Sequence, residues 1–252
     1  MHMLRKFIFL FIGVFSALFS KPVEFPQVID FGSFDLRPSY AGERGWQWYL
    51  RNANYQSVLG AFNGAPEFGA FFAFLKNEYH IDIVIETGTH LGNTTQFLAT
   101  CFPEVHTIEI METHCNRAKE IFKSQPNVHC HLGSSEKVLS ELLPSLIDKP
   151  IVFYLDAHWY DYWPLVDEIE EIAKTHKNNC VIVIDDFKVP GRNDLAYDAY
   201  VIDGILHECS YEYIKAHMEK AFTDYNMHFL LPKNAIARAK FVAVPKKMVL
   251  RS

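Results

Sequence analysis

Acidic side chains stand where two predicted strands end, and they are the residues best placed to do chemistry. Asp156 follows the apolar run Ile151–Leu155. Asp185 and Asp186 follow the run Val181–Ile184. Parallel strands present their carboxyl ends at one edge of a sheet, so these three carboxylates are expected to converge there. They would repel one another unless they are protonated, hydrogen-bonded or coordinated by a cation. Oxygen ligands suit Mg²⁺, Mn²⁺ or Ca²⁺, so the sequence predicts a divalent metal site, with Mg²⁺ favoured, at Asp156, Asp185 and Asp186.

A glycine-containing turn follows the first apolar run, Ile81–Ile85. Gly88 and Gly92 allow the backbone to turn tightly and to approach a ligand closely. The segment lacks the G-x-G-x-x-G spacing that a dinucleotide pyrophosphate requires. A ligand site at the end of a strand is therefore predicted, with a purely structural turn as the alternative. Glu109, near the end of the run Val105–Ile110, can accept hydrogen bonds from ribose hydroxyls, a device that dehydrogenases and methyltransferases share.

The scaffold that must position these residues alternates strands with helices. Such alternation predicts an α/β fold with right-handed crossovers and a mainly parallel sheet. Strands are expected at 81–85, 105–110, 128–132, 151–155 and 181–184, and helices at 66–79, 93–100, 112–124, 136–146 and 165–175. A long helix, either continuous or interrupted near Cys209-Ser210, is expected over 196–222, followed by two strands at 227–231 and 239–244.

This pattern resembles the class I S-adenosylmethionine-dependent methyltransferases. The acidic residue followed by G-x-x-x-G, from Glu86 to Gly92, resembles their motif I, and the closing strand pair resembles their C-terminal hairpin. The resemblance implies a Rossmann-like, doubly wound, mainly parallel seven-stranded sheet that ends in an antiparallel hairpin. It also implies S-adenosyl-L-methionine as the cofactor, with Glu86 orienting its methionyl part and Ser134 lying beside its adenine, although Ser134 could equally cap the following helix. The expected cofactor-binding residues are Glu86, Thr87, Gly88, Gly92, Thr94, Glu109, Ser134 and Asp156.

The acidic cluster resembles that of the metal-dependent O-methyltransferases. Catechol-type enzymes carry an Asp after the fourth strand and an Asp–Asn pair after the fifth. The segment Asp185-Asp186-Phe187 is closer to macrocin-type sugar O-methyltransferases, which have Asp-Asp followed by an aromatic residue. The resemblance implies that a divalent metal binds acceptor oxygens and lowers the pKa of the reacting hydroxyl.

One departure from the catechol type concerns the general base. The lysine that those enzymes carry three residues after the first metal-binding Asp is replaced here by Trp159. His158 is the nearest group with a suitable intrinsic pKa, so it is the predicted catalytic base. His158 could instead be a metal ligand, and Tyr160, Asp161 and Lys188 are alternative bases. The helix residues Glu168, Glu170 and Glu171 are expected to form a solvated face.

The leading functional hypothesis is methyl transfer to an oxygen of a small-molecule or sugar acceptor. Two alternatives come from other classes. The first is a nicotinamide-dependent oxidoreductase, which Glu109 fits and the glycine spacing does not. The second is a non-catalytic exported binding protein with a methyltransferase-like fold. A net charge of −6 without a long basic run argues against nucleic acid as a partner. The chain can still form a homo-oligomer.

The chain begins with a segment unlike the rest. Arg5 and Lys6 precede the apolar run Phe7–Phe19, which has the layout of a signal peptide or a membrane anchor. The run is shorter than the roughly 20 residues that a membrane span needs. The expected organisation is therefore an export signal or anchor at 1–20, an N-terminal extension or cap at 21–79 and a methyltransferase domain at 80–252. The protein is expected to be exported or membrane-tethered through that first segment, and cytoplasmic otherwise.

Overall fold

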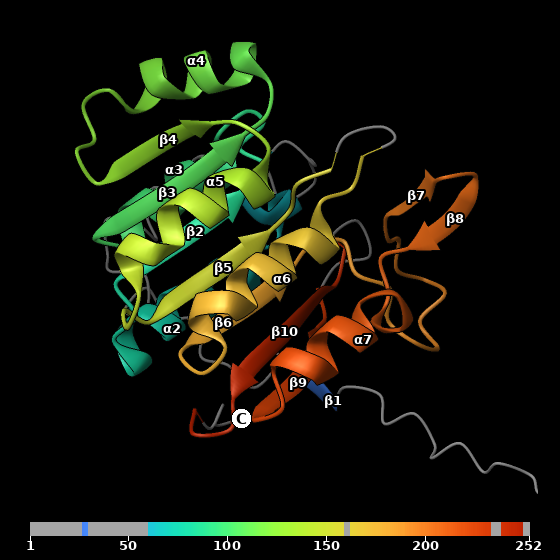
Figure 1. The fold of residues 1–252 in the computed structure, drawn as a ribbon. Coiled ribbons are helices and arrows are strands. Elements are labelled where there is room, and N and C mark those ends of the chain that lie inside the picture. Colours follow the sequence, from blue (N-terminus) through green and yellow to red (C-terminus); the bar gives the residue numbers. More distant parts are fainter. Residues whose placement is uncertain (1–26, 30–59, 159–161, 233–237, 249–252) are drawn as a thin grey trace, which may run out of the picture.

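The chain folds around one central β-sheet (Figure 1). The computed structural model describes residues 27–29, 60–158, 162–232 and 238–248. In this part of the chain eight strands are ordered β1-β9-β10-β6-β5-β2-β3-β4, and β10 alone runs antiparallel to the others. The strands are β1 Gln27–Ile29, β2 Ile83–Thr87, β3 Glu104–Glu109, β4 Val128–Leu132, β5 Ile151–Leu155, β6 Cys180–Ile184, β9 Tyr225–Leu230 and β10 Lys240–Pro245.

The middle of the sheet is fully buried. Every residue of β2, β5 and β6 is buried, as expected for Ile- and Val-rich strands that are covered on both faces. The chain runs from β2 to β3 and β4 on one side, and from β5 to β6 on the other. The strand order therefore reverses between β2 and β5. In open α/β sheets this reversal opens a crevice at the carboxyl ends of the strands, where ligands bind.

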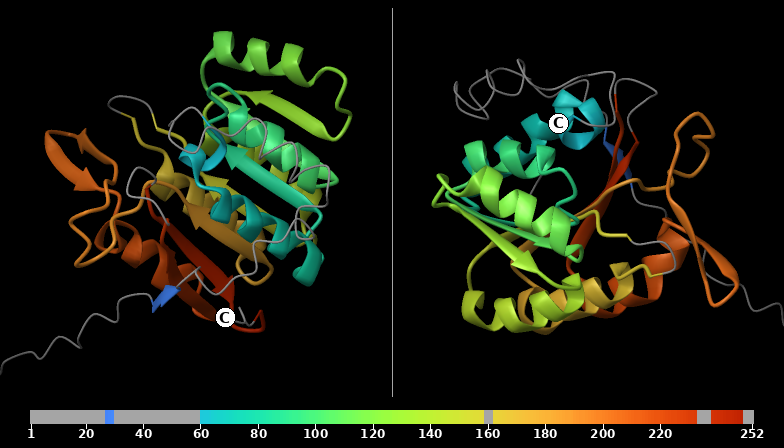
Figure 2. Two further views of the ribbon diagram at one scale, coloured as in Figure 1. Left: turned by 180° about the vertical axis from the view of Figure 1, so that it is seen from behind. Right: turned by 90° about the horizontal axis from the view of Figure 1, so that it is seen from above.

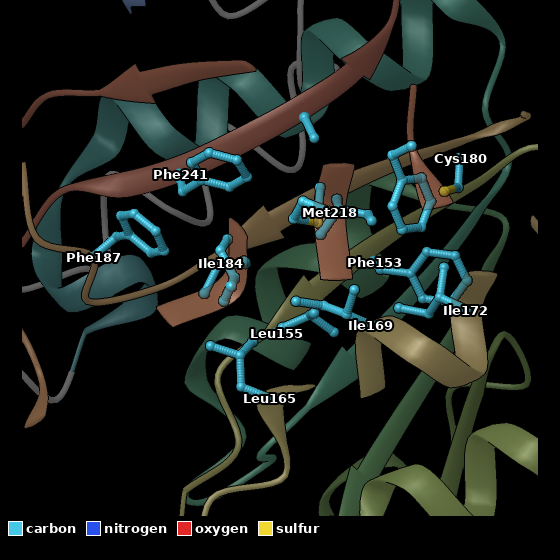
Figure 3. Packing of buried hydrophobic residues seen from close by; sticks show 14 of the residues in the cluster. Phe153, Leu155, Leu165, Ile169, Ile172, Cys180, Ile184, Phe187, Met218 and Phe241 are labelled. Carbon is cyan, nitrogen blue, oxygen red and sulfur yellow. The ribbon is translucent and has the colours of Figure 1, made fainter. Parts of the chain in front are cut away.

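Helices cover both faces of the sheet (Figure 2). Helices α2, α3 and α4 lie on one face, and α5, α6 and α7 lie on the other. Their bounds are α2 Pro66–Tyr79, α3 Asn93–Cys101, α4 Glu112–Phe122, α5 Ser135–Leu142, α6 Leu165–His176 and α7 Tyr211–Ala221, with short 3₁₀ turns at Ala61–Gly64 and Leu143–Leu146. Figure 3 shows the apolar core on the α6 and α7 side, where Ile169 and Met218 pack with Phe153 and Phe241 of the sheet.

Helix α2 confirms the helix predicted over 66–79. Pro66 stands in its first turn, where a missing N–H costs nothing, and His80 ends it in a left-handed conformation. The side chains of Phe68, Phe71 and Phe72 are at most 1% exposed and pack against the sheet. The aromatic positions of this helix therefore build the core.

The predicted alternation of strands and helices from 81 to 184 is confirmed, as is the closing pair β9 and β10. The seven-stranded methyltransferase sheet is present, with β1 added beside β9. The helix predicted over 196–222 forms only beyond the interruption considered at Cys209-Ser210, where α7 begins. Its first part is wrong, because residues 199–208 form a separate antiparallel hairpin, β7 Ala199–Ile202 and β8 Ile205–Glu208. Asp203 and Gly204 have φ values of 51° and 77°, the left-handed backbone of a two-residue hairpin turn.

Several sequence-based predictions fall outside the described residues. These include the export segment at 1–20 and the residues Trp159, Tyr160 and Asp161. In the part of the chain that the structure describes, no helix has the length and apolar character needed to cross a membrane.

Candidate active site

A cleft of about 970 Å³ opens at the carboxyl ends of the parallel strands. The loops that directly follow β2, β3, β4, β5 and β6 each contribute to its wall. Its lining residues are Asn63, Gly88, His90, Ile108, Glu109, Ile110, Met111, His114, Gly133, Ser134, Ser135, Asp156, Ala157, His158, Tyr162, Pro164, Asp186, Asp198, Tyr200 and Arg238. The cleft spans the point at which the strand order reverses.

The turn after β2 brings the backbone close to the loop after β5. Gly88 has a φ of 84°, and a Cβ atom placed on it would lie 2.6 Å from the carbonyl oxygen of Asp156. The backbone N–H of Asp156 donates to the carbonyl oxygen of Thr87 at 3.2 Å. Only glycine satisfies both the left-handed backbone and this close approach. Gly92, with a φ of 79°, stands just before α3.

Glu86 is buried beneath this turn, outside the lining of the cleft. Its Oε2 atom accepts hydrogen bonds from the hydroxyl groups of Thr95 and Thr107, the latter at 2.7 Å. Burial raises the pKa of the Glu86 carboxyl group to about 7. In this structure Glu86 therefore stabilises the turn through its hydrogen bonds to Thr95 and Thr107. Thr94 likewise has a local partner, because its hydroxyl oxygen accepts from the backbone N–H of Phe62 at 3.2 Å.

Glu109 ends β3 and lines the cleft. Its Oε2 atom accepts from the backbone N–H of His90 at 2.8 Å, and its Oε1 atom accepts from that of Met111 at 2.9 Å. These two bonds fix the carboxylate at the rim while its remaining lone pairs stay available. Ser134 lines the cleft at the N-cap position of α5, and its hydroxyl group donates to Glu136. Glu109 and Ser134 are thus both placed to contact one ligand.

The three predicted carboxylates do converge. Asp156, Asp185 and Asp186, joined by Asp198, line a small enclosed cavity of about 20 Å³, which is room for one water molecule. Burial and the charges of the neighbouring aspartates raise the pKa values of Asp156 and Asp186 well above their usual range. This acidic cluster therefore needs positive charge nearby to remain ionised.

A buried lysine forms an ion pair with Asp185. Lys240, the first residue of β10, is 0% exposed, and its ammonium group donates to Oδ1 of Asp185. The same Oδ1 atom accepts the backbone N–H of Asp186 at 2.7 Å, and the hydroxyl group of Tyr154 donates to Oδ2. The ammonium group also lies 4.5 Å from the centre of the Phe68 ring. Asp185 is therefore held by three donors within the protein.

A second cation meets the other two aspartates. The Nη1 atom of Arg238 donates to Oδ2 of Asp186 at 2.6 Å and also to Oδ1 of Asp198. The side-chain amide of Asn63 donates to Oδ1 of Asp186 at 3.3 Å, and the hydroxyl group of Tyr200 donates to Oδ2 of Asp198 at 2.5 Å.

The acidic cluster therefore does not fit the metal site that the sequence predicted. The carboxylate oxygens of Asp185, Asp186 and Asp198 are occupied by donors of the chain itself. Within the described ranges, no three His, Cys, Asp or Glu side chains are arranged to hold a metal ion. Of the predicted triad, Asp156 and Asp186 line the cleft and Asp185 does not.

His158 lies at the mouth of the cleft beside the acidic cluster. Its side chain is 48% exposed, its Nε2 atom lies 3.9 Å from Oδ2 of Asp198, and its ring stacks on Tyr200 at 5.3 Å. The alternative base Lys188 is held elsewhere, because its ammonium group donates to Glu208 at 2.5 Å and it does not line the cleft. The structure thus places His158 where a proton acceptor for the cleft would stand.

Some residues of the site have no counterpart in the sequence-based prediction. The rings of His90 and His114 stack at 5.3 Å along the cleft wall, and Ile110 exposes 42% of its surface there. An exposed aliphatic residue directly after a buried strand is a signal that could have marked Ile110 as a ligand contact. Arg238 and Lys240 gave no such signal, because only the antiparallel pairing of β10 with β6 brings them to the aspartates.

The expectation that Glu168 lies on a solvated face is wrong. Glu168 is 0% exposed, and burial raises the pKa of its carboxyl group to about 7. It stands three residues after Leu165 and four before Ile172, so the helix places all three on its buried side. Its neighbour Glu170 is on the surface and pairs with His217 at 2.8 Å.

Comparison with known proteins agrees with this geometry. Residues 85–187 match the model of a methyltransferase domain family. An O-methyltransferase from Bacillus cereus, solved in complex with SAH, is 20% identical with a TM-score of 0.54, over 83% of this chain and 91% of that one. The O-methyltransferase TomG from Streptomyces achromogenes, involved in tomaymycin synthesis and solved with SAM, is 16% identical with a TM-score of 0.54, over 78% and 88% of the two chains. A search of curated protein sequences gave no significant match.

These structural likenesses establish the fold, and the family match covers the turn after β2 and the ends of β3, β5 and β6. The predicted Rossmann-like methyltransferase architecture is confirmed. Neither the oxidoreductase nor the non-catalytic binding protein is favoured by any of these comparisons. The position of the cleft and the match of residues 85–187 agree with this architecture, and the solved structures show that the chain has the fold of the class I, S-adenosylmethionine-dependent methyltransferases.

Proposed function

We propose that the protein transfers the methyl group of S-adenosylmethionine to a hydroxyl oxygen of a small polar acceptor, with a sugar as the favoured class. The observation that carries the proposal is the cleft at the strand ends, which has Gly88, Glu109 and Ser134 along one side and Asp156, His158 and Asp198 along the other. At about 970 Å³ it lies at the upper end of the usual range for small-molecule sites, which suits a cofactor and an acceptor together.

The cofactor half is assigned to the loops after β2, β3 and β4. Glu109 accepts hydrogen bonds from the ribose hydroxyls, for which a carboxylate has lone pairs to spare. Ile110 offers an apolar surface to one face of the adenine, and Ser134 contacts its edge. The turn at Gly88 lets the methionyl part pass close to the backbone, with Glu86, Thr87, Gly92 and Thr94 shaping that turn from outside the lining.

The acceptor half is assigned to the loops after β5 and β6 and to the β7–β8 hairpin. The lining there combines carboxylates, Arg238 and the aromatic rings of Tyr162 and Tyr200. Carboxylates and a guanidinium group match the hydroxyls of a polyol, and aromatic rings pack against the apolar face of a sugar ring. The solved O-methyltransferases with this fold support oxygen as the acceptor atom.

The reaction needs positioning and one proton acceptor. The site aligns the acceptor oxygen, the methyl carbon and the sulfonium sulfur in a line, and such alignment supplies a large part of the rate. His158 takes the hydroxyl proton, and Asp198 beside it stabilises the imidazolium ion that forms. The divalent cation predicted from the sequence is left out of this reaction, because two of the three carboxylates expected to bind it, Asp185 and Asp186, are paired with Lys240 and Arg238.

Isothermal titration of the full chain with S-adenosylmethionine, with NAD as the comparison ligand, tests the proposal. S-adenosylmethionine should bind and NAD should not. Glu109→Ala should weaken S-adenosylmethionine binding by roughly 2–4 kcal/mol, through loss of charge-assisted hydrogen bonds. The matched control Glu112→Ala, on α4 outside the cleft lining, should bind like wild type. Binding of NAD in place of S-adenosylmethionine would overturn the proposal.

A further inference from the structure

The acidic cluster at the ends of β5 and β6 carries its own cation. We propose that Arg238 is the resident positive charge of the acceptor half, and that it occupies the place in which related enzymes would hold a divalent metal. The transfer then proceeds without a bound metal ion. The inference rests on the proposed function only in assigning this half of the cleft to the acceptor.

The first argument is that every oxygen of two carboxylates already accepts from a donor of the chain. Asp186 accepts from Arg238 on Oδ2 and from Asn63 on Oδ1. Asp198 accepts from Arg238 on Oδ1 and from Tyr200 on Oδ2. A metal ion at these oxygens would stand next to the guanidinium group, and the two positive charges would repel each other at that distance.

The second argument is that the backbone builds this arrangement. The N–H of Phe187 donates to the carbonyl oxygen of Ala239 at 2.8 Å, which fixes Arg238 beside Asp186. The N–H of Asp198 donates to the carbonyl oxygen of Asp186 at 2.9 Å, which fixes the second acid. Main-chain pairing on both sides therefore brings the guanidinium group between the two carboxylates.

The third argument concerns the kind of cation. Arginine is charged at every physiological pH, and its guanidinium group pairs with carboxylates at low cost in desolvation. Arg238 is also 34% exposed and lines the cleft, so the acceptor can reach it. Lys240 cannot take this role, because it is fully buried behind Asp185. Lys240 is instead a positioning residue that holds Asp185 in place through a direct ion pair.

The test measures binding of Mn²⁺ to the full chain, and electron paramagnetic resonance detects the ion that stays free. Wild type should leave Mn²⁺ free. Arg238→Met keeps the apolar stem and removes the charge, so this variant should gain about one bound Mn²⁺ per chain at the vacated carboxylates. Arg238→Lys keeps the charge and should behave like wild type. The matched control is Arg192→Met, because Arg192 pairs with Asp194 on the surface and does not line the cleft.

Stoichiometric binding of Mn²⁺ to wild type would overturn the proposal. So would failure of Arg238→Met to gain binding, or an equal gain in Arg192→Met. Titration with S-adenosylmethionine separates this result from the proposed function. An Arg238→Met protein that still binds S-adenosylmethionine is folded with an intact cofactor half, whereas loss of S-adenosylmethionine binding in wild type would count against the function itself. A second variant, Asp198→Asn in the Arg238→Met background, should abolish the gained Mn²⁺ site.

Discussion

At the scale of single residues, the carboxylates of this protein fall into two groups: some line the cleft, and others are buried outside its lining. Glu109 and Asp156 line the cleft, whereas Glu86 and Glu168 are nearly or fully inaccessible. Both buried groups have pKa values raised to about 7 by burial. In the described structure the two oxygens of Glu168 have no hydrogen-bond partner. Ionisation of such a buried carboxyl group lowers the free energy of unfolding. The effect can therefore be tested by measuring stability at different pH values.

Glu168→Gln should remove a pH-dependent loss of stability. The folded pKa of about 7 lies above the ordinary value of 4.5, so the folded state binds more protons between these values. The free energy of unfolding therefore falls as pH rises through this window and is level above it. The variant should gain on the order of 2–3 kcal/mol over wild type at pH 8 relative to pH 5. Urea unfolding at the two pH values measures this, with exposed Glu141→Gln as the control; an equal effect at both pH values would contradict it.

Gly88→Ala should abolish cofactor binding, because the new Cβ atom would lie 2.6 Å from the carbonyl oxygen of Asp156. Gly191 provides a matched control, since its φ of 77° is similar and no atom lies within 4 Å of an added Cβ. Gly191→Ala isolates the backbone strain, about 1–2 kcal/mol. Titration with S-adenosylmethionine and thermal melting should separate the two variants. If Gly88→Ala and Gly191→Ala lose affinity and stability equally, the close approach of Gly88 to Asp156 does not contribute to cofactor binding.

His158→Ala should lower methyl-transfer turnover by roughly 10²–10⁴-fold, since it removes the proposed general base. The affinity for S-adenosylmethionine should change little, because His158 lies in the acceptor half. His207→Ala, on β8 outside the cleft lining, is the control and should turn over normally. Turnover can be followed as SAH release with any acceptor that wild type methylates. A near-normal rate in His158→Ala would reassign the proton acceptor.

At the scale of helices and strands, the sequence predicts best the elements that are buried along their whole length. Strands β2, β5 and β6 are short apolar runs because both of their faces are covered, and each was predicted within two residues of its start. The β7–β8 hairpin was missed because its apolar residues are exposed: Val201, Ile205 and Leu206 expose 55–63% of their surface. An exposed hairpin leaves no periodic pattern of burial, although Asp203-Gly204 is a hairpin turn signal in the sequence.

The residues of the candidate site likewise fall into a group that the sequence predicts and a group that it does not. Residues that end or directly follow a parallel strand, such as Glu109 and Asp156, could be predicted from the strand alone, because the fold collects strand ends at one edge. Arg238 and Asn63 could not be, since their positions depend on how β10 and the turn before α2 pack against that edge. The sequence therefore predicts the acids of the site and misses the cation that neutralises them.

The β7–β8 hairpin should be removable without loss of the fold. Ala199 and Glu208 are cross-strand partners, so residues 200–207 can be replaced by Asn-Gly, a two-residue hairpin turn. S-adenosylmethionine affinity should stay within about threefold, or less than 1 kcal/mol, because Tyr200 alone brings the excised segment into the cleft lining. Turnover should fall sharply, since Tyr200 supports both His158 and Asp198. Loss of cofactor binding on excision would place the hairpin in the cofactor half instead.

At the scale of the whole molecule, the segment before Lys21 is proposed to lie outside the fold. The run Phe7–Phe19 is apolar all round, and each large side chain costs about 1.5–3 kcal/mol to leave in water. Deletion of residues 2–20 should therefore yield a soluble protein with an unchanged melting temperature and unchanged S-adenosylmethionine affinity. The matched comparison is the full chain in detergent. A truncated protein that fails to fold would show that the segment belongs to the core.

The position of β10 in the chain has a consequence for biosynthesis. Asp185 is separated from Lys240 by 55 residues, so the acids leave the ribosome well before the cation that buries them. At 5–20 residues per second, this interval lasts about 3–11 s. Until β10 has been made and has paired with β6, Asp185 lacks the lysine that meets it in the folded protein. Pairing of β10 therefore adds a strand to the sheet and brings a cation to the acidic cluster in the same step.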